Sequence, residues 1–284
     1  MSRLSIILPA KNEAPALADL LPRLRAAHPE AEIIVVDDGS TDDTCRICAD
    51  AGVVCLSSPY SMGNGAAIKR GARAAAGEVL VFMDGDGQHD PADVARLLAK
   101  LGEGYDMAVG ARDWGSQAGV GRGVANTLYN WLATRMTGHE VADLTSGFRA
   151  VRADKFREFL YLLPNGFSYP TTSTMAFFRS AYPVAYVPIK AAQRVGKSHI
   201  KPIKDGVRFL LIIFKIATLY SPLKLFVPTS VVFFLLGCVN YTWTFMHEGR
   251  LTNGSTLLWS AAVIVFLIGL VSEQITALTY RRDV

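Results

Sequence analysis

The chain contains 284 residues, has a formal net charge of +4 at pH 7 and is 50% hydrophobic. This length leaves room for one α/β domain of about 200 residues and a smaller appendage. The positive excess is too small for a dedicated nucleic-acid binder, and much of it flanks apolar segments, which favours phosphate groups or an anionic membrane surface as partners. The four cysteines form neither a zinc-ligand pattern nor a disulfide framework, and no secretory signal opens the chain, so we expect reduced thiols and a cytosolic folded part.

Short apolar runs alternate with helical patterns through most of the chain. We expect strands at residues 4–8, 33–36, 53–56, 79–83, 107–109 and 184–188, and helices at 14–27, 44–51, 66–76 and 91–101. Strands that alternate with helices indicate an α/β fold with a mostly parallel, doubly wound sheet and right-handed crossovers.

Polar residues follow three of these strands: residues 9–13, Asp37 with Asp38, and residues 84–88. Because the carboxyl ends of parallel strands meet at one edge of the sheet, where such folds bind ligands, we expect these three segments to meet. Gly63 and Gly65 begin the next helix, and they serve either to offer backbone N–H groups to a phosphate or to permit tight helix packing.

The stretch 79–91 reads V-L-V-F-M-D-G-D-G-Q-H-D-P, a buried strand that ends in two carboxylates one residue apart. Gly85 and Gly87 remove side chains between Asp84 and Asp86, so that backbone, ion and phosphate can approach closely. Mg²⁺ or Mn²⁺ suits this loop, because such ions take one or two protein carboxylates and fill the other positions with water and substrate phosphates.

The acidic loop has three other interpretations. An acidic surface turn is the simplest, since D-x-D spacing is common by chance. An EF-hand is excluded, because its loop glycine would fall at His89 and its bidentate glutamate at Ala95. A receiver domain shares an acidic pair and a further aspartate after a strand, but requires neither the D-G-D-G-Q loop nor an apolar C-terminal region.

The second half of the α/β region has three distinct segments. Residues 125–137 form an amphipathic helix that either lies at a bilayer interface or packs on the sheet. Residues 143–149, D-L-T-S-G-F-R, are a candidate acceptor-side element, and residues 190–204 are a basic loop that we expect to close over phosphates.

The C-terminal region is strongly apolar. Residues 205–221 predict an interfacial amphipathic helix, and residues 223–246 and 254–278 each exceed the roughly 20 residues that span a bilayer core. More basic residues flank this hairpin at its two ends than in its short connection, so the positive-inside rule predicts that both termini are cytosolic. Within the second span, Glu273 is expected near the cytosolic end, where it can snorkel or pair with Arg281 or Arg282.

Five motifs in one order resemble the family 2 glycosyltransferases with a GT-A fold, in particular the polyprenyl-phosphate glycosyltransferases of the dolichol-phosphate mannose synthase kind. The motifs are P-A-K-N-E at 9–13, V-D-D-G-S-T-D-D-T at 36–44, D-G-D-G-Q-H-D at 84–90, S-G-F-R at 146–149 and R-V-G-K-S at 194–198. The resemblance covers residues 4–204, which implies a GT-A domain at 1–204, the interfacial helix at 205–221 and a membrane hairpin at 222–284.

The resemblance implies an inverting, metal-dependent transfer of one sugar from a UDP- or GDP-linked donor to undecaprenyl or dolichyl phosphate, at the cytosolic face of a bacterial or archaeal plasma membrane. A homo-oligomer is left open. The implied nucleotide contacts are Pro9, Ala10, Glu13, Asp37, Asp38, Asp84 and Gly85, and the implied Mg²⁺ or Mn²⁺ ligands are Asp84, Asp86 and Gln88. The implied acceptor and phosphate contacts are Arg112, Arg122, Ser146, Arg149, Arg194, Lys197 and Ser198, of which Arg112 and Arg194, with Asp86, are expected to be catalytic.

Two departures from the family pattern weaken any assignment of the sugar. The family often has alanine and leucine where this chain has Gly85 and Gly87, and its basic motif often has one more residue between arginine and glycine. Two alternative functions remain: a processive polysaccharide synthase, which would need more protein than one hairpin to line a polymer channel, and a catalytically silent nucleotide-binding membrane scaffold.

Overall fold

The structure, a computed structural model, describes residues 3–112, 120–166, 168–190, 211, 214, 218 and 220–279. For residues 120–126 and 279 it describes the backbone alone. The chain divides into two units, Met1–Phe209 and Leu210–Val284, and each is described by itself.

The first unit is organised around one seven-stranded sheet, in the order β3-β2-β1-β4-β6-β5-β7. Its strands are β1 (Leu4–Ala10), β2 (Glu32–Asp37), β3 (Val54–Ser57), β4 (Val79–Phe82), β5 (Met107–Arg112), β6 (Arg149–Arg152) and β7 (Val184–Ile189). β6 runs antiparallel to β4 and β5, whereas the other neighbours pair in parallel. The expected mostly parallel sheet is therefore confirmed, with β6 as a strand that the sequence pattern did not predict.

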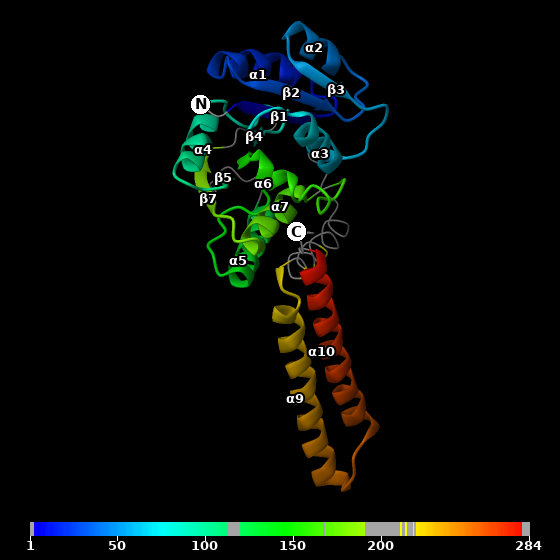
Figure 1. The fold of residues 1–284 in the computed structure, drawn as a ribbon. Helices are drawn as coiled ribbons and strands as arrows, with labels where there is room; N and C mark the ends of the chain where they lie inside the picture. Colours follow the sequence, from blue (N-terminus) through cyan, green and yellow to red (C-terminus); the bar gives the residue numbers. More distant parts are fainter. Residues whose placement is uncertain are drawn as a thin grey trace. The chain divides into compact units, whose positions relative to one another are not determined.

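Helices cover both faces of this sheet (Figure 1), which explains why β1, β2 and β4 are almost continuously apolar. The helices are α1 (Ala14–Ala27), α2 (Thr44–Asp50), α3 (Asn64–Ala74), α4 (Asp93–Gly102), α5 (Val120–Thr137), α6 (Ala153–Arg157) and α7 (Tyr169–Arg179). Buried side chains of α1, α2 and α4 join one core with Ile6 and Val35. Successive strand residues point to opposite faces, so Ile7 and Val36 meet α3 on the other side, where Gly71 packs against them.

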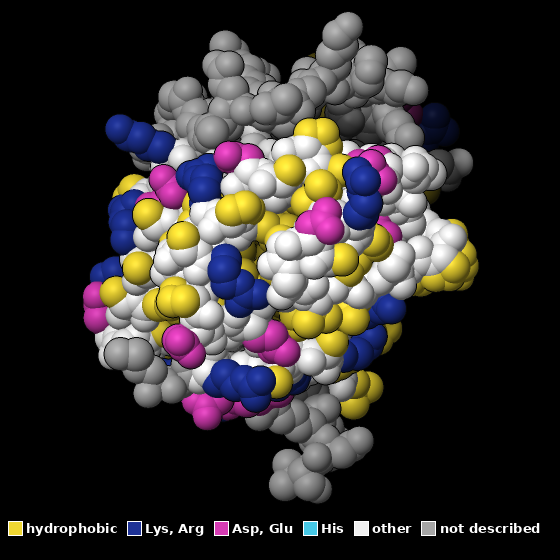
Figure 2. All heavy atoms as spheres, turned by 90° about the horizontal axis from the view of Figure 1, so that it is seen from above, with side chains coloured by type: hydrophobic (Ala, Val, Ile, Leu, Met, Phe, Trp, Pro, Cys, Tyr) yellow, Lys and Arg dark blue, Asp and Glu magenta, His cyan; other side chains and the backbone are white. Residues whose placement is uncertain are grey.

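The parallel strands carry their following loops to one edge of the sheet. β1, β2 and β4 are aligned in register, with Ala10 opposite Asp37 and Ile7 opposite Phe82. Residues 11–13, 38–43 and 83–92 leave the sheet at that edge, as the sequence predicts. On the face shown in Figure 2, basic and acidic side chains are interspersed and form no continuous field of one sign.

The second unit is a hairpin of two long helices, α9 (Leu223–Glu248) and α10 (Asn253–Thr279). Both are long and apolar enough to cross a membrane, with mean hydropathies of 1.8 and 2.2. They agree with the two expected spans. Small residues allow close packing between the helices: a Cβ added at Gly237 would lie 2.5 Å from Trp259 Cδ1, and one at Gly269 would lie 2.6 Å from Phe226 Cβ.

Glu273 has a structural role that the sequence did not predict. Its carboxylate accepts hydrogen bonds from the Ser221 hydroxyl (3.1 Å) and from the backbone N–H of Leu223 (3.3 Å). Since Leu223 is the first residue of α9, this carboxylate caps the N-terminus of the neighbouring helix. The expected partners Arg281 and Arg282, and most of the expected interfacial helix at 205–221, lie outside the described residues.

Candidate active site

The acidic loop that follows β4 packs tightly against the end of β1. A Cβ added at Gly85 would lie 3.2 Å from the Pro9 carbonyl oxygen, so a larger residue would press the loop away from the strand. The Gly85 N–H points to the same carbonyl, at 3.4 Å. Gly87 adopts a φ of +75°, which favours glycine, and the Gln88 N–H donates to Asp86 Oδ1 at 3.1 Å. These contacts shape a loop that carries Asp84, Asp86 and Gln88 at every second position.

The donor set of this loop fits a hard divalent cation. Two carboxylates and one side-chain amide provide oxygen ligands alone, the type that Mg²⁺ and Mn²⁺ prefer. Among the described residues, no three His, Cys, Asp or Glu side chains gather into a self-contained metal site. A cation held here would therefore need oxygens from water or from a substrate phosphate to complete its coordination.

Asp84, at the start of the acidic loop, lies close to Gly147 of the D-L-T-S-G-F-R segment, which is far away in the sequence. A Cβ added at Gly147 would lie 3.2 Å from Asp84 Oδ2, and Tyr169 holds that glycine by donating its hydroxyl to the Gly147 carbonyl at 2.9 Å. On another side, His89 Nε2 lies 3.8 Å from Asp84 Oδ2. The tertiary structure thus brings the expected metal loop and the expected acceptor-side element together.

A cavity of about 80 Å³ opens beside this junction. It is lined by Asn64, Asp84, Thr145, Gly147, Gly166, Ser168, Tyr169, Pro170 and Thr171. The side chain of Asp84 keeps 35% of its surface exposed, so its carboxylate is accessible to a ligand.

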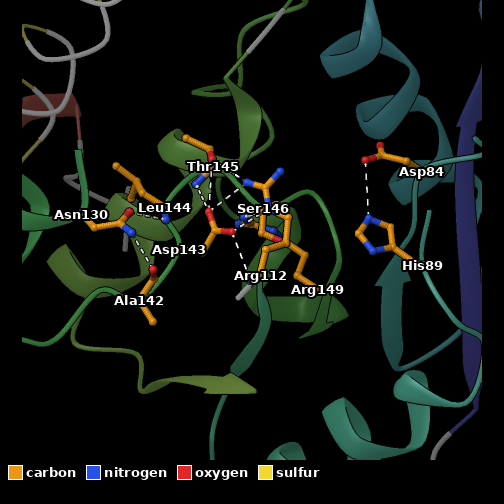
Figure 3. Close-up of polar contacts among 10 residues, drawn as sticks. All are labelled: Asp84, His89, Arg112, Asn130, Ala142, Asp143, Leu144, Thr145, Ser146 and Arg149. Atoms are coloured by element: carbon orange, nitrogen blue, oxygen red, sulfur yellow. Dashed lines mark hydrogen bonds and ion pairs between the residues drawn. The ribbon is translucent and has the colours of Figure 1, made fainter. Parts of the chain in front are cut away.

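Arg112 is fixed in place at the end of β5 by a buried carboxylate. Its Nε donates to Asp143 Oδ2 at 2.8 Å, and its Nη2 donates to Asp143 Oδ1 at 3.1 Å and to Thr145 Oγ1 at 2.8 Å (Figure 3). Burial alone would raise the pKa of Asp143, but the hydrogen bonds and charge of Arg112 hold it below its usual value. Burial likewise opposes the charge of Arg112, and the bonds to Asp143 raise its pKa above the ordinary arginine value.

Asn130 of α5 holds the backbone on both sides of Asp143. Its side-chain nitrogen donates to the Ala142 carbonyl at 2.5 Å, and its side-chain oxygen accepts from the Leu144 N–H at 2.9 Å. The inner face of α5 buries Tyr129, Ala133 and Met136, whereas Leu128 and Trp131 are exposed. The helix packs on the rest of its unit through one face. Its other face is exposed, and its expected position at a bilayer interface stays a prediction.

Asp37 and Asp38 organise the loops around the sheet edge. Asp37 accepts hydrogen bonds from the Ser40 N–H (2.8 Å) and the Ser57 hydroxyl (2.7 Å), and these bonds outweigh burial, so that the pKa of Asp37 lies below its usual value. Asp38 accepts from the backbone N–H groups of Met62 (2.6 Å) and Gly63 (2.9 Å). Both carboxylates therefore shape the edge at which a nucleotide would bind, and their direct contact with a nucleotide stays a prediction.

The two other N-terminal candidates lie at the same edge. Ala10 accepts a hydrogen bond from the Asp38 N–H at 2.9 Å, which ties the ends of β1 and β2 together. Glu13 is partly buried immediately before α1. The structure thus brings Pro9, Ala10, Glu13, Asp37, Asp38, Asp84 and Gly85 to one edge of the sheet.

The glycines at the start of α3 serve helix packing, which was one of the two expected roles. A Cβ added at Gly65 would lie 1.9 Å from the Pro164 carbonyl oxygen. Three backbone N–H groups at this helix start are engaged within the protein: Gly63 donates to Asp38, Gly65 to the Gly166 carbonyl and Ala66 to the Asn165 carbonyl. These three groups are not available to a phosphate, and binding of a phosphate by this turn stays a prediction.

Arg149 is placed differently from the expected acceptor contact. It is fully buried, and its Nη1 donates to the Pro170 carbonyl (3.0 Å), the Ser173 hydroxyl (2.7 Å) and the Thr174 hydroxyl (3.1 Å). Its Nη2 donates to the Ser146 carbonyl. Arg149 therefore joins β6 to the first turns of α7 and is not positioned to touch an acceptor. Ser146 is also buried, at 1% exposure.

Four of the expected phosphate contacts cannot be located. The side chain of Arg122, and all of Arg194, Lys197 and Ser198, lie outside the described residues. Their roles stay predictions.

The model of glycosyl transferase family 2 matches residues 5–160, which is more than half of the chain and extends from β1 beyond β6. The chain belongs to glycosyl transferase family 2. A second model, the GtrB C-terminal hairpin, matches residues 221–278, and with α9 and α10 it indicates membrane association of this glycosyltransferase.

Several curated relatives of this family 2 glycosyltransferase are named as undecaprenyl-phosphate sugar transferases. An undecaprenyl-phosphate mannosyltransferase of Micrococcus luteus is 31% identical over 211 residues, covering 69% of this chain and 86% of that protein. An undecaprenyl-phosphate 4-deoxy-4-formamido-L-arabinose transferase of Klebsiella pneumoniae is 33% identical over 162 residues, covering 54% of this chain. The match spans about half, 49%, of the Klebsiella protein's length. Glycosyltransferase AglJ of Haloferax volcanii is 28% identical over 96% of this chain and 93% of that protein.

Solved structures confirm the GT-A fold of the glycosyltransferase unit. Glucosyl-3-phosphoglycerate synthase from Mycobacterium tuberculosis, in complex with Mn²⁺, uridine-diphosphate-glucose and phosphoglyceric acid, superposes with a TM-score of 0.61 at 24% identity. The alignment covers 76% of this chain and 79% of that protein.

Sequence reasoning missed three residues of this glycosyltransferase site: His89, Asn130 and Asp143. The signal for Asp143 was present, because an aspartate three residues before S-G-F-R lies in the segment already identified as acceptor-side. Asn130 carried no signal, since a polar residue on an amphipathic helix normally faces solvent. His89 lies inside the acidic motif, but its burial beside Phe148 depends on a contact across 59 positions of sequence.

Proposed function

We propose that this family 2 glycosyltransferase transfers a single sugar, with inversion at the anomeric carbon, from a UDP- or GDP-linked donor to undecaprenyl or dolichyl phosphate. One observation carries the proposal: Asp84 of the acidic loop lines one cavity together with Thr145 and Gly147, and the guanidinium of Arg112 donates to Thr145 Oγ1 at 2.8 Å. The hairpin matched by the GtrB model and the names of the curated relatives support a lipid acceptor.

Divalent metal use is part of this proposal. Asp84, Asp86 and Gln88 would hold Mg²⁺ or Mn²⁺, and the bound cation would neutralise charge on the departing diphosphate. The Mn²⁺ in the superposable synthase is consistent with this donor set. Pro9, Ala10, Glu13, Asp37, Asp38 and Gly85 would shape the nucleotide-binding edge.

The chemistry requires little from a general base. An acceptor phosphate is already an oxyanion near neutral pH, so the protein must position it and stabilise the leaving diphosphate. Arg112 suits this task, because Asp143 holds its guanidinium through two bonds and 31% of its side chain remains exposed to a ligand. Arg122, Ser146, Arg194, Lys197 and Ser198 remain proposed on the acceptor and phosphate side, with Arg194 as a second cation for the phosphates.

The proposed orientation places the catalytic unit and both termini in the cytosol of a bacterial or archaeal cell. Lys224 precedes most of α9, and Arg281 and Arg282 follow α10, whereas Arg250 is the single basic residue of the connection at 249–252. Cysteine accessibility from either side of sealed vesicles, probed at Ser2 and at Asn253, tests this orientation.

The test of the activity uses the full-length protein in detergent with undecaprenyl phosphate, Mn²⁺ and a panel of labelled UDP- and GDP-sugars. We expect label from one donor in the extracted lipid phase, and its loss of at least about 100-fold in Asp86→Asn. Asp50→Asn is the matched control, because Asp50 is exposed at the end of α2. Release of free sugar without lipid labelling would contradict the lipid acceptor, and full activity of Asp86→Asn would contradict the metal loop.

A further inference from the structure

His89, within the acidic loop, contacts both the core residue Phe148 and the loop carboxylate Asp84. Its side chain is 5% exposed, and its ring stacks on Phe148 with centroids 4.7 Å apart and planes inclined by 15°. Nε2 faces Asp84 Oδ2 at 3.8 Å (Figure 3). Nδ1 is buried and has no hydrogen-bond partner among the described residues.

Packing alone does not account for a histidine at this position. A phenylalanine or leucine would fill the space beside Phe148 without burying an unpaired ring nitrogen. Among the described residues, the polar side chain that the ring reaches is Asp84. The 3.8 Å separation is longer than a direct hydrogen bond, so His89 acts on the carboxylate through its N–H dipole and bulk, or through a bridging water.

Asp84 is confined on two sides by these neighbours. Gly147 lies against its carboxylate, held there by the Tyr169 hydroxyl, and His89 Nε2 lies 3.8 Å from the same oxygen, Oδ2. These two neighbours limit the positions open to the carboxylate, and Asp84 lines the cavity. A coordinating side chain that its neighbours already hold in place loses less conformational entropy when it binds a cation.

We infer that His89 is a positioning residue, which orients Asp84 through Nε2 for binding of a divalent cation. This inference rests on the proposed metal loop. It assigns no proton transfer to His89 and no direct contact between His89 and the cation.

Three variants separate the role of Nε2 from that of ring packing. The amide nitrogen of glutamine reproduces the position of Nε2, so His89→Gln retains a donor toward Asp84. The shorter asparagine places its amide near Nδ1, and His89→Phe keeps the stack on Phe148 with no donor at all. Thermal unfolding of each variant in detergent checks that the fold is retained.

The readout is Mn²⁺ affinity, measured by electron paramagnetic resonance of free Mn²⁺ with the full-length protein, first alone and then with UDP or GDP. We expect wild type and His89→Gln to bind within about threefold of each other, and His89→Asn and His89→Phe to bind about 10- to 100-fold more weakly. Equal affinity in all four proteins, or equal weakening in all three variants, would overturn the role of Nε2 and leave the proposed function intact. Absence of Mn²⁺ binding by wild type would instead remove the metal loop, and this inference with it.

Discussion

Arg112 and Asp143 form a two-point ion pair, with Nε to Oδ2 at 2.8 Å and Nη2 to Oδ1 at 3.1 Å. Asp143 is fully buried, whereas Arg112 is partly exposed. The pair fastens the end of β5 to the segment that carries Gly147 beside Asp84. A guanidinium held in this way is oriented before any phosphate arrives, which reduces the cost of ordering it during binding.

Asp143→Asn should therefore impair both stability and activity. Removing one partner of a buried ion pair costs about 3 kcal/mol or more, which corresponds to a fall in apparent Tm of about 6 to 12 °C. Misplacement of Arg112 should lower transfer to the lipid by about 100-fold. Differential scanning fluorimetry in detergent and the lipid-phase assay measure the two effects.

The control for this substitution is Asp50→Asn, at an exposed carboxylate distant from the sheet edge. We expect its Tm and activity to match wild type. An Asp143→Asn protein with wild-type turnover would show that the ion pair does not orient Arg112 for the reaction.

The same pair predicts a stability loss in acid. The pKa of Asp143 in the folded protein lies below the unfolded value of about 3.9, so its contribution is complete at neutral pH. As the pH falls below about 4, the unfolded chain takes up a proton more readily than the folded one, and stability declines through the folded pKa. Tm measured from pH 7 to pH 3 should fall more steeply in wild type than in Asp143→Asn, whose amide does not titrate. Parallel pH profiles would contradict the assignment.

Metal removal should abolish transfer while leaving the protein folded. The proposed oxygen donors Asp84, Asp86 and Gln88 would leave coordination positions for a substrate diphosphate, so the cation would act in the reaction and not as a structural core. Treatment with EDTA should reduce lipid labelling by at least about 100-fold, and added Mn²⁺ or Mg²⁺ should restore it. Tm should change little on EDTA treatment without nucleotide. Undiminished turnover in EDTA would refute metal dependence.

Gly65→Ala should destabilise the glycosyltransferase unit by overpacking. The new Cβ would lie 1.9 Å from the Pro164 carbonyl oxygen, a backbone atom that can move only with the 164–166 loop. We expect a loss of about 1 to 3 kcal/mol, or roughly 2 to 12 °C in Tm.

Gly102→Ala is the matched control for that substitution. Gly102 ends α4, and a Cβ there would meet nothing within 4 Å, so the change should be neutral or slightly stabilising. A Gly65→Ala protein as stable as Gly102→Ala would show that the 164–166 loop yields easily.

Local patterns were sufficient to predict most elements of the fold. The apolar runs of β1, β2 and β4 are buried on both faces, and this makes a parallel central strand recognisable without knowing its neighbours. The lengths of α9 and α10 were predicted within a few residues, because the thickness of a bilayer core sets the length of an apolar helix that spans it. The meeting of residues 9–13, 37–38 and 84–88 followed from a rule of parallel sheets that holds whatever the side chains are.

Pairings between distant segments were decided by the tertiary structure. β6 is four residues long and enters the sheet antiparallel between β4 and β5, a position that depends on hydrogen bonds to both neighbours. Arginine is a residue type that commonly binds phosphate, but the fold buries Arg149 against α7. Burial, and not residue type, therefore sets the role of Arg149.

By itself the sequence determined the class of this protein: an α/β glycosyltransferase unit with an acidic loop at its sheet edge and an apolar hairpin after it. Those features follow from the spacing of apolar residues and from motifs of a few residues, which can be recognised locally in the sequence. The tertiary structure alone decided which charges pair, placing Asp143 against Arg112 and His89 against Asp84 and Phe148. Such contacts depend on which distant segments the fold brings together, and the free energy of a buried charge depends on the partner that it contacts there.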